Sequence, residues 1–322
     1  MSRSRIVSTG GPNILALLVA CTAITLAASN FDPINTGGSP GSLNAASLTP
    51  ASISLPPSPP MPQSASEDGQ STAPAESKHL SGIWAMRLST EMLRRGCLAF
   101  RQHPDYSAVM TKQERIGGSL GDSQTIELKV RHDAFSAYMK WLTGDSGRQL
   151  IYVEGQNDGH LLVQPGGIKG RLTGVLSLEP TGALAMAECR YPVTKVGLIA
   201  LAETVLENQL SDVKRGTGFR CELRDDQSFD RRPCYLFIVE YDSAKVHSVY
   251  RKSVLYIDKE LSLPICVRNY TWGVDVAPER MDQDTLVELY AYSDIQTRCG
   301  FSDVDFDPTN PEYKLRVKKS RQ

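Results

Sequence analysis

The sequence has few of the features that mark metalloproteins or nucleic-acid-binding proteins. It contains no C-x-x-C pair and no H-E-x-x-H segment, and its five histidines are scattered, so no metal site is indicated. The formal net charge of −1 at pH 7 gives no strong field that would attract nucleic acid. We therefore expect no metal, no cofactor and no nucleic-acid partner.

Two stretches match catalytic motifs only in part. Residues 117–121 (GGSLG) fit the G-x-S-x-G pattern of serine hydrolases, but that pattern needs a helix after the serine, and an alternating strand follows here. Residues 144–147 (GDSG) resemble a serine-protease signature, but Arg148 takes the place of its last glycine, and no histidine oriented by an acid is indicated. We interpret both stretches as turns and expect no catalytic residues and no enzyme activity.

Residues 155–159 (GQNDG) are rich in the residue types that cradle phosphate or bind calcium. They lie between two short apolar runs, and no helix follows whose N-terminus could bind a phosphate. Gly, Asn and Asp also tolerate the positive φ angles that tight turns require. We interpret this stretch as the turn of a β-hairpin.

The longest apolar run extends from Ile14 to Ala28 and follows Arg3 and Arg5, which is typical of a secretory signal. Two forms of processing remain open. The stretch that ends at Cys21 resembles a bacterial lipobox, in which this cysteine is lipidated, whereas ordinary cleavage would follow Ser29. An uncleaved membrane anchor is a third interpretation. Each of them predicts an exported protein with a signal at residues 1–29.

Residues 30–78 are rich in proline and serine and contain a single aromatic residue, Phe31. Such a segment cannot bury enough apolar surface to offset the entropy of the chain, so we interpret it as a disordered tether. We expect one folded domain at residues 79–317 and a basic tail at 318–322.

The folded part shows two kinds of periodicity. Apolar residues recur at helical spacing over 79–102 and over 196–210, and alternate with polar residues in the segments between and after these helices. The order of helix, strands, helix and strands indicates an α+β fold with a largely antiparallel sheet. The expected strands are 126–130, 135–141, 151–153, 161–163, 172–178, 183–189, 219–223, 235–241, 253–257, 265–272 and 285–295.

Export would place the six cysteines after Cys21 in an oxidising compartment. The number is even, but fifteen pairings are possible, and buried free thiols are an equal alternative. The expected strands at 219–223 and 235–241 read as neighbours, which makes Cys221 and Cys234 the candidate disulfide.

Four stretches resemble a bacterial envelope family catalogued as domain of unknown function fifteen seventy-one. They are residues 106–116 (YSAVMTKQERI), 135–155 (FSAYMKWLTGDSGRQLIYVEG), 191–198 (YPVT followed by GL) and 305–313 (DFDPTNPEY). The family is similar to the periplasmic lipoprotein carriers that sort outer-membrane lipoproteins. This resemblance implies a curved antiparallel sheet, an open half-barrel, with helices on its concave side and an apolar cavity for acyl chains.

The resemblance implies a non-catalytic envelope protein that binds a lipid, an acyl chain or another apolar ligand in an internal cavity. It also implies a periplasmic location, either free or attached to the membrane through the signal or a lipid anchor. The alternative is a protein–protein interaction module whose core is filled by its own side chains. The candidate cavity residues are Phe135, Met139, Trp141 and Ile151 from strands, and Leu88, Met92, Leu201 and Val205 from helices.

Overall fold

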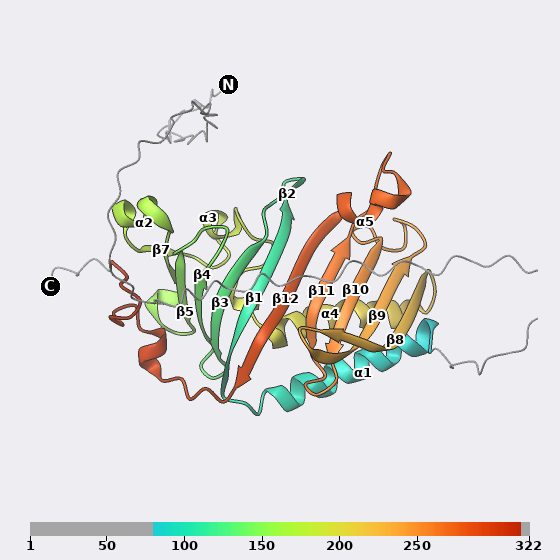
Figure 1. Ribbon diagram of the computed structural model, residues 1–322, viewed down its shortest axis with the longest axis horizontal. Helices are drawn as coiled ribbons and strands as arrows, with labels where there is room; N and C mark the ends of the chain where they lie inside the picture. Colours follow the sequence, from blue (N-terminus) through green and yellow to red (C-terminus); the bar gives the residue numbers. More distant parts are fainter. Residues whose placement is uncertain (1–79, 317–322) are drawn as a thin grey trace, which may run out of the picture. The chain divides into compact units, whose positions relative to one another are not determined.

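The computed structural model describes residues 80–316 (Figure 1). The predicted export signal at 1–29 with Cys21, the predicted tether at 30–78 and the basic tail at 318–322 lie outside these residues. Within the described part of the chain, no helix has both the length and the apolar character needed to cross a membrane.

The dominant element is one antiparallel sheet of twelve strands. Eleven follow one another in the order β7-β6-β5-β4-β3-β1-β12-β11-β10-β9-β8, and the short β2 pairs with β1. The sheet stays open because the strands at the ends of this path, β7 and β8, do not pair with each other. The strands are β1 (Asp105–Ile116), β2 (Ser119–Leu120), β3 (Gln124–Arg131), β4 (Ser136–Trp141), β5 (Gln149–Val153), β6 (Leu161–Gln164), β7 (Leu176–Leu178), β8 (Phe219–Phe229), β9 (Arg232–Tyr241), β10 (Lys252–Asp258), β11 (Pro264–Tyr270) and β12 (Leu286–Thr297).

Two long helices, α1 (Gly82–Phe100) and α4 (Leu198–Arg215), pack on each other and on the sheet (Figure 1). A hydrogen bond of 2.8 Å from the Ser89 hydroxyl to Gln209 joins them. The predicted fold class is confirmed: a curved, open antiparallel half-barrel with helices on its concave side. The shorter helical elements are α2 (Gly167–Thr173), α3 (Ala183–Met186), α5 (Met281–Asp284), η1 (Asn157–Gly159), η2 (Val193–Lys195), η3 (Pro278–Arg280) and η4 (Asp303–Phe306).

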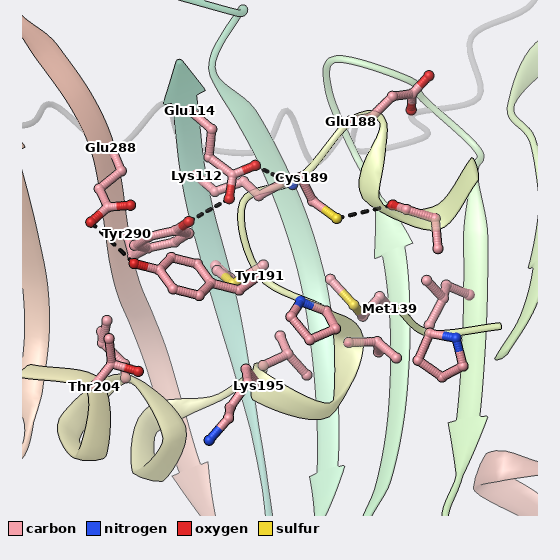
Figure 2. A pocket seen from close by; sticks show the side chains of 18 of the residues that line it. Lys112, Glu114, Met139, Glu188, Cys189, Tyr191, Lys195, Thr204, Glu288 and Tyr290 are labelled. Atoms are coloured by element: carbon pink, nitrogen blue, oxygen red, sulfur yellow. Dashed lines mark hydrogen bonds and ion pairs between the residues drawn. The ribbon is translucent and has the colours of Figure 1, made fainter. Parts of the chain in front are cut away.

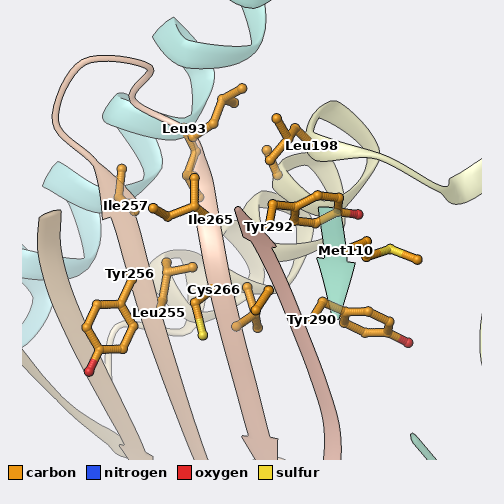
Figure 3. Close-up of a cluster of buried hydrophobic side chains, with 14 of the residues drawn as sticks. Leu93, Met110, Leu198, Leu255, Tyr256, Ile257, Ile265, Cys266, Tyr290 and Tyr292 are labelled. Atoms are coloured by element: carbon orange, nitrogen blue, oxygen red, sulfur yellow. The ribbon is translucent and has the colours of Figure 1, made fainter. Parts of the chain in front are cut away.

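The buried side chains of α1 recur at helical spacing, and those of α4, namely Leu198, Ala202, Gln209 and Asp212, also lie on one side of the helix. Figure 3 shows Leu93 of α1 and Leu198 of α4 directed toward apolar side chains of β10, β11 and β12. Gly96 allows α1 to approach the β10–β11 turn closely, since a Cβ at this position would lie 2.1 Å from the Ser262 carbonyl oxygen. The main core therefore lies between the helices and the second half of the sheet.

The outer face of β3, β4 and β5 is covered by the segment 298–316, which we call the C-terminal strap. The Tyr313 ring stacks on Tyr138 of β4, with 4.0 Å between ring centroids. Lys129 of β3 donates to Asp305 at 2.9 Å and to the Tyr313 hydroxyl at 3.2 Å. Both faces of this part of the sheet are consequently buried, and the outer one forms a small separate core with Phe306 at its centre.

The three predicted turns are confirmed. Residues 155–159 connect the antiparallel strands β5 and β6, and Gly155 and Gly159 have φ angles of 78° and 77°. Residues 117–121 turn from β1 into β2, so the serine of the G-x-S-x-G pattern precedes no helix. Residues 144–147 connect β4 to β5.

Two of the predicted strands are wrong, and two strands were missed. The range 172–178 contains the end of α2 and only the three-residue β7, and 183–189 begins with α3. The sequence of α3, Ala-Leu-Ala-Met, consists of strong helix formers, and Leu184 is 77% exposed, so its apolar alternation is not that of a half-buried strand. The missed strands are β1, at the centre of the sheet, and the two-residue β2 that pairs with it.

The predicted disulfide between Cys221 and Cys234 is also wrong. Strands β8 and β9 are neighbours as expected, but their register places Cys221 opposite Val239 and Cys234 opposite Gln227. Five residues along β9 separate Val239 from Cys234, which is roughly 17 Å of strand. Both cysteines are buried free thiols.

Candidate ligand pocket

A pocket lies between the inner face of the sheet and the chain that runs from β7 through α3 and η2 into α4. Its walls come from β1, β4, β5, β6, β11 and β12 on the sheet side. Its cavity volume is about 150 Å³. One part of the wall is apolar, and the other carries a cluster of charged and hydroxyl side chains (Figure 2).

The apolar part is built by the periodicities of a strand and a helix. Met139 and Trp141 are two residues apart on β4 and therefore point to the same side, and Leu201 and Val205 are four apart on α4. Trp141 is fixed on two sides: its indole N–H donates to Gln124 at 3.0 Å, and the Arg148 guanidinium lies 5.1 Å from its ring centroid. Trp141 is thus held in place by Gln124, which lies outside the pocket, and by Arg148, which is part of the lining.

Four of the eight predicted cavity residues line this pocket, namely Met139, Trp141, Leu201 and Val205. The other four lie elsewhere. Ile151 pairs with Tyr138 across β4 and β5, so it faces the C-terminal strap on the outer side of the sheet. Phe135 precedes β4 and packs near Tyr152, with 6.1 Å between ring centroids.

Leu88 and Met92 were predicted to reach the cavity from the first helix, and this part of the prediction is wrong for a topological reason. Helix α1 packs against α4 and β8, beyond the far side of α4 from the pocket. Leu88 is 38% exposed, and Met92 packs on the main core.

The polar part of the pocket centres on two carboxylates in neighbouring strands. Glu114 of β1 accepts hydrogen bonds from the Tyr290 hydroxyl and from the Lys112 ammonium, the latter at 3.1 Å (Figure 2). Lys112 and Glu114 point the same way because they are two residues apart on β1.

Glu288 of β12, which is only 2% exposed, is the more deeply buried of the two carboxylates. It accepts from the Arg190 guanidinium at 2.6 Å, the Tyr250 hydroxyl at 2.6 Å and the Asn269 amide at 2.7 Å. A buried carboxylate is stable only when its oxygens are paired in this way. Its oxygens are therefore paired with fixed donors of the protein without any further partner.

The proton positions in this cluster follow from its pKa shifts. Burial, and then the neighbouring Glu114 carboxylate, raises the pKa of Tyr290, while burial followed by Glu288 does the same for the pKa of Tyr250. Burial alone would lower the pKa of Arg190, but the charge of Glu288 outweighs it and raises that pKa. The phenols therefore remain hydrogen-bond donors, and the guanidinium remains a cation.

The thiol in the pocket lining is not activated as a nucleophile. The Cys189 thiol lines the pocket, but burial raises its pKa, and its sulfur lies 3.0 Å from the Ala185 carbonyl oxygen, to which the S–H donates. Among the residues that the structure describes, no group of three His, Cys, Asp or Glu side chains is placed to hold a metal. The arrangement suits binding by apolar contact and by fixed hydrogen-bonding groups.

The polar part of the pocket was not predicted from the sequence. The signal available was the order Met110, Lys112, Glu114 on one side of the family stretch 106–116, with Arg190 just before the stretch at 191–198. Strand β1 was not predicted from the sequence, and its pairing with β12 is what brings Glu114 beside Glu288.

A family model described as "Protein of unknown function (DUF1571)" matches residues 103–315. No curated protein matches the sequence. Among solved structures, the lipoprotein LppX of Mycobacterium tuberculosis is similar at 10% identity and a TM-score of 0.40, over 69% of this chain and 99% of that one. A putative outer membrane lipoprotein-sorting protein domain from Vibrio parahaemolyticus is similar at 12% identity and a TM-score of 0.32, over 69% and 97%. The MucA/MucB complex of Pseudomonas aeruginosa gives 16% identity and a TM-score of 0.39, over 68% and 60%.

Proposed function

We propose that this chain, which belongs to the DUF1571 family, binds an apolar ligand without chemical conversion in the pocket between its sheet and α4. The observation that carries the proposal is an unfilled apolar chamber beside a buried polar cluster. Protein cores are normally packed at the density of organic crystals. An unfilled space of this size is therefore unusual if the residues around it only stabilise the fold. The ligand class is a lipid, an acyl chain or a similar apolar group.

The size of the cavity limits how much of a ligand it encloses. At about 150 Å³ it equals an engineered cavity that binds benzene. Ligand sites that enclose whole drug-sized molecules measure roughly 300–1,000 Å³. The pocket is thus suited to one ring or a short section of an acyl chain, each enclosed CH₂ contributing about 0.8 kcal/mol. The rest of a longer ligand would extend past the mouth.

Solvent extraction of the purified protein, followed by mass spectrometry, tests the proposal directly. A bound apolar compound is expected in the wild type and should be lost when Val205→Trp fills the chamber. The matched control is Leu210→Trp, which alters the same helix at a residue that does not line the pocket. Urea unfolding of both variants shows whether they fold.

Displacement of an environment-sensitive apolar dye gives a second measurement on the same three proteins. Equal dye binding by the wild type and Val205→Trp, with nothing extracted from either, would refute the pocket proposal. It would favour the alternative, an interaction module with a filled core.

Export is a separate part of the proposal, and it rests on the sequence of residues 1–29. Cell fractionation should recover the protein outside the cytoplasm. Labelling with a radioactive fatty acid separates the two processing routes, because Cys21→Ala abolishes labelling only if this cysteine is the lipidated residue. Recovery from the cytoplasm with the N-terminus intact would contradict export.

A further inference from the structure

We propose that the pocket binds an amphiphile with an acidic head group, and that the Lys112 ammonium holds this head group. The inference rests on the proposed function and adds the class of ligand. The head group must carry an anionic oxygen. A single carboxylate, as in a fatty acid, fits the small site best.

The first argument is the unused hydrogen-bonding capacity of Lys112. Its side chain is only 12% exposed and lines the pocket, yet Glu114 is its sole acceptor in the described part of the chain. An ammonium has three N–H donors, and burial removes the water that would otherwise satisfy them. Two donors of Lys112 are therefore available to a ligand.

The second argument is the charge around the site. Three ion pairs lie on or beside the pocket, and they join Lys112 to Glu114, Arg190 to Glu288, and Arg148 to Glu188. Lys195 also lines the pocket and has no ion-pair partner among the described residues. The lining itself carries three cations and three carboxylates, so its formal charges balance, and Lys195 is the lining cation that an anionic group of a ligand could pair with.

The two carboxylates do not oppose such a ligand as strongly as their number suggests. Glu288 accepts from a guanidinium, a phenol and an amide, and Glu114 accepts from Tyr290 and Lys112. Their charge is already distributed over fixed donors. A ligand carboxylate at Lys112 would share the ammonium with Glu114, much as two acceptors share one lysine in ion-pair networks.

The third argument is the order of side chains along β1. Tyr106, Ala108 and Met110 on the inner side are apolar or directed at α4, and Lys112 and Glu114 follow them on the same side. The wall therefore changes from apolar to charged within one strand. A head group at Lys112 would place its tail against Met110, the next inner residue of β1, and toward Met139, so the wall favours one orientation for an amphiphile.

Binding of dodecanoic acid, methyl dodecanoate, dodecanol and dodecyl phosphate to the full chain tests the inference. The wild type should bind the acid about tenfold or more tightly than the ester, which is the value of one charge-assisted hydrogen bond. Lys112→Met keeps the length of the side chain and removes its charge, so acid affinity should fall to that of the ester while ester affinity is unchanged. Lys112→Arg should retain the preference. The matched control is Lys140→Met, an exposed lysine of β4 outside the pocket.

The possible results separate this inference from the proposed function. If the wild type binds acid and ester equally, the head-group site is refuted and the apolar pocket stands. If it binds none of the four probes, both fail. If Lys112→Met binds the ester but keeps the preference for the acid, Lys112 is the wrong residue. Should that variant not fold, Lys112→Gln is used with the same criteria, and tighter binding of dodecyl phosphate than of the acid would overturn the assignment to carboxylate.

Discussion

Glu114 and Glu288 lie directly opposite each other across the pair of strands β1 and β12. Like charges at such positions normally destabilise a sheet. Here each carboxylate has a cation of its own, Lys112 for Glu114 and Arg190 for Glu288, and phenol hydroxyls take up further lone pairs. The seam between the two halves of the sheet therefore contains a network in which both carboxylates are paired with cations and phenol hydroxyls.

Removal of the charge of Glu288 should show how much this network contributes. In Glu288→Gln the Arg190 guanidinium loses its partner in a largely buried site, and we expect a loss of about 3 kcal/mol in the free energy of unfolding. Urea unfolding at pH 7 measures it. The control is Glu188→Gln, in which an exposed glutamate also paired with an arginine is changed, and it should cost less than about 1 kcal/mol. Equal losses in the two variants would contradict the network.

The start of α4 depends on one hydroxyl. The backbone N–H of Leu198 donates to the Tyr106 hydroxyl oxygen at 2.9 Å, and both groups are buried. Tyr106→Phe should leave that N–H without an acceptor and lower the free energy of unfolding by about 1–3 kcal/mol. Tyr152→Phe serves as the control, because its hydroxyl makes no hydrogen bond within the described residues. If Tyr106→Phe is as stable as Tyr152→Phe, the start of α4 does not depend on the Tyr106 hydroxyl.

Gly197, the residue before α4, should tolerate no side chain. Its φ is +107°, and a Cβ there would lie 2.4 Å from the Tyr106 hydroxyl oxygen. We expect Gly197→Ala to destabilise by more than 1 kcal/mol, about the cost of forcing alanine into such a backbone conformation, with the clash in addition. Gly216→Ala, at the end of the same helix with φ of +76° and open space around it, isolates the backbone part. Thermal unfolding of both proteins gives the comparison.

Attachment of the C-terminal strap should depend on pH through Asp305. Burial would raise the pKa of Asp305, but hydrogen bonds from Ser302 and Lys129 outweigh it and lower that pKa. A lowered pKa in the folded state means that the carboxylate stabilises above its unfolded pKa of about 3.9 and loses this contribution as pH falls below it. The stability difference between wild type and Asp305→Asn should be full at pH 7 and should shrink below about pH 4. A difference independent of pH would exclude the ionised pair as the strap's anchor.

The cysteines should react in the order of their exposure. Burial raises the pKa of Cys221 and of Cys234 to about 12, and that of Cys266 to about 11, so few thiolates are present at neutral pH. Cys299 is exposed. Brief treatment with iodoacetamide and peptide mass spectrometry should find Cys299 alkylated first and the three buried thiols only after unfolding. A peptide that joins Cys221 to Cys234 would contradict their register.

The sequence predicted best those elements whose burial is one-sided. Strand β3 shows strict alternation because Ile126, Leu128 and Val130 are buried and the outer residues between them are charged, and α4 shows helical spacing because one of its faces meets the core. Strand β4 was recognised from the same alternation, although its outer side chain Tyr138 is buried as well. The strap that buries Tyr138 comes from residues more than a hundred positions away, which no local pattern encodes.

The candidate site could be predicted only in its apolar half for the same reason. Met139 and Trp141 reveal their direction through alternation within one strand, whereas Glu288 belongs in the pocket only because β12 pairs with β1. Ile151 was misplaced because the sequence shows that a residue is apolar but not which side of a doubly covered strand it faces. The prediction that Leu88 lines the cavity was wrong because helical spacing does not show which neighbour a helix packs on.

The pairing of β1 with β12 also has a consequence for how the protein is made. Strand β1 ends at Ile116 and its partner begins at Leu286, so β1 has no neighbour on that side until nearly the whole domain has left the ribosome. Pairings between such distant segments form slowly, since a long loop must close first. The wall of the pocket is therefore complete only late in synthesis, when β12 is available and Glu288 comes to lie opposite Glu114.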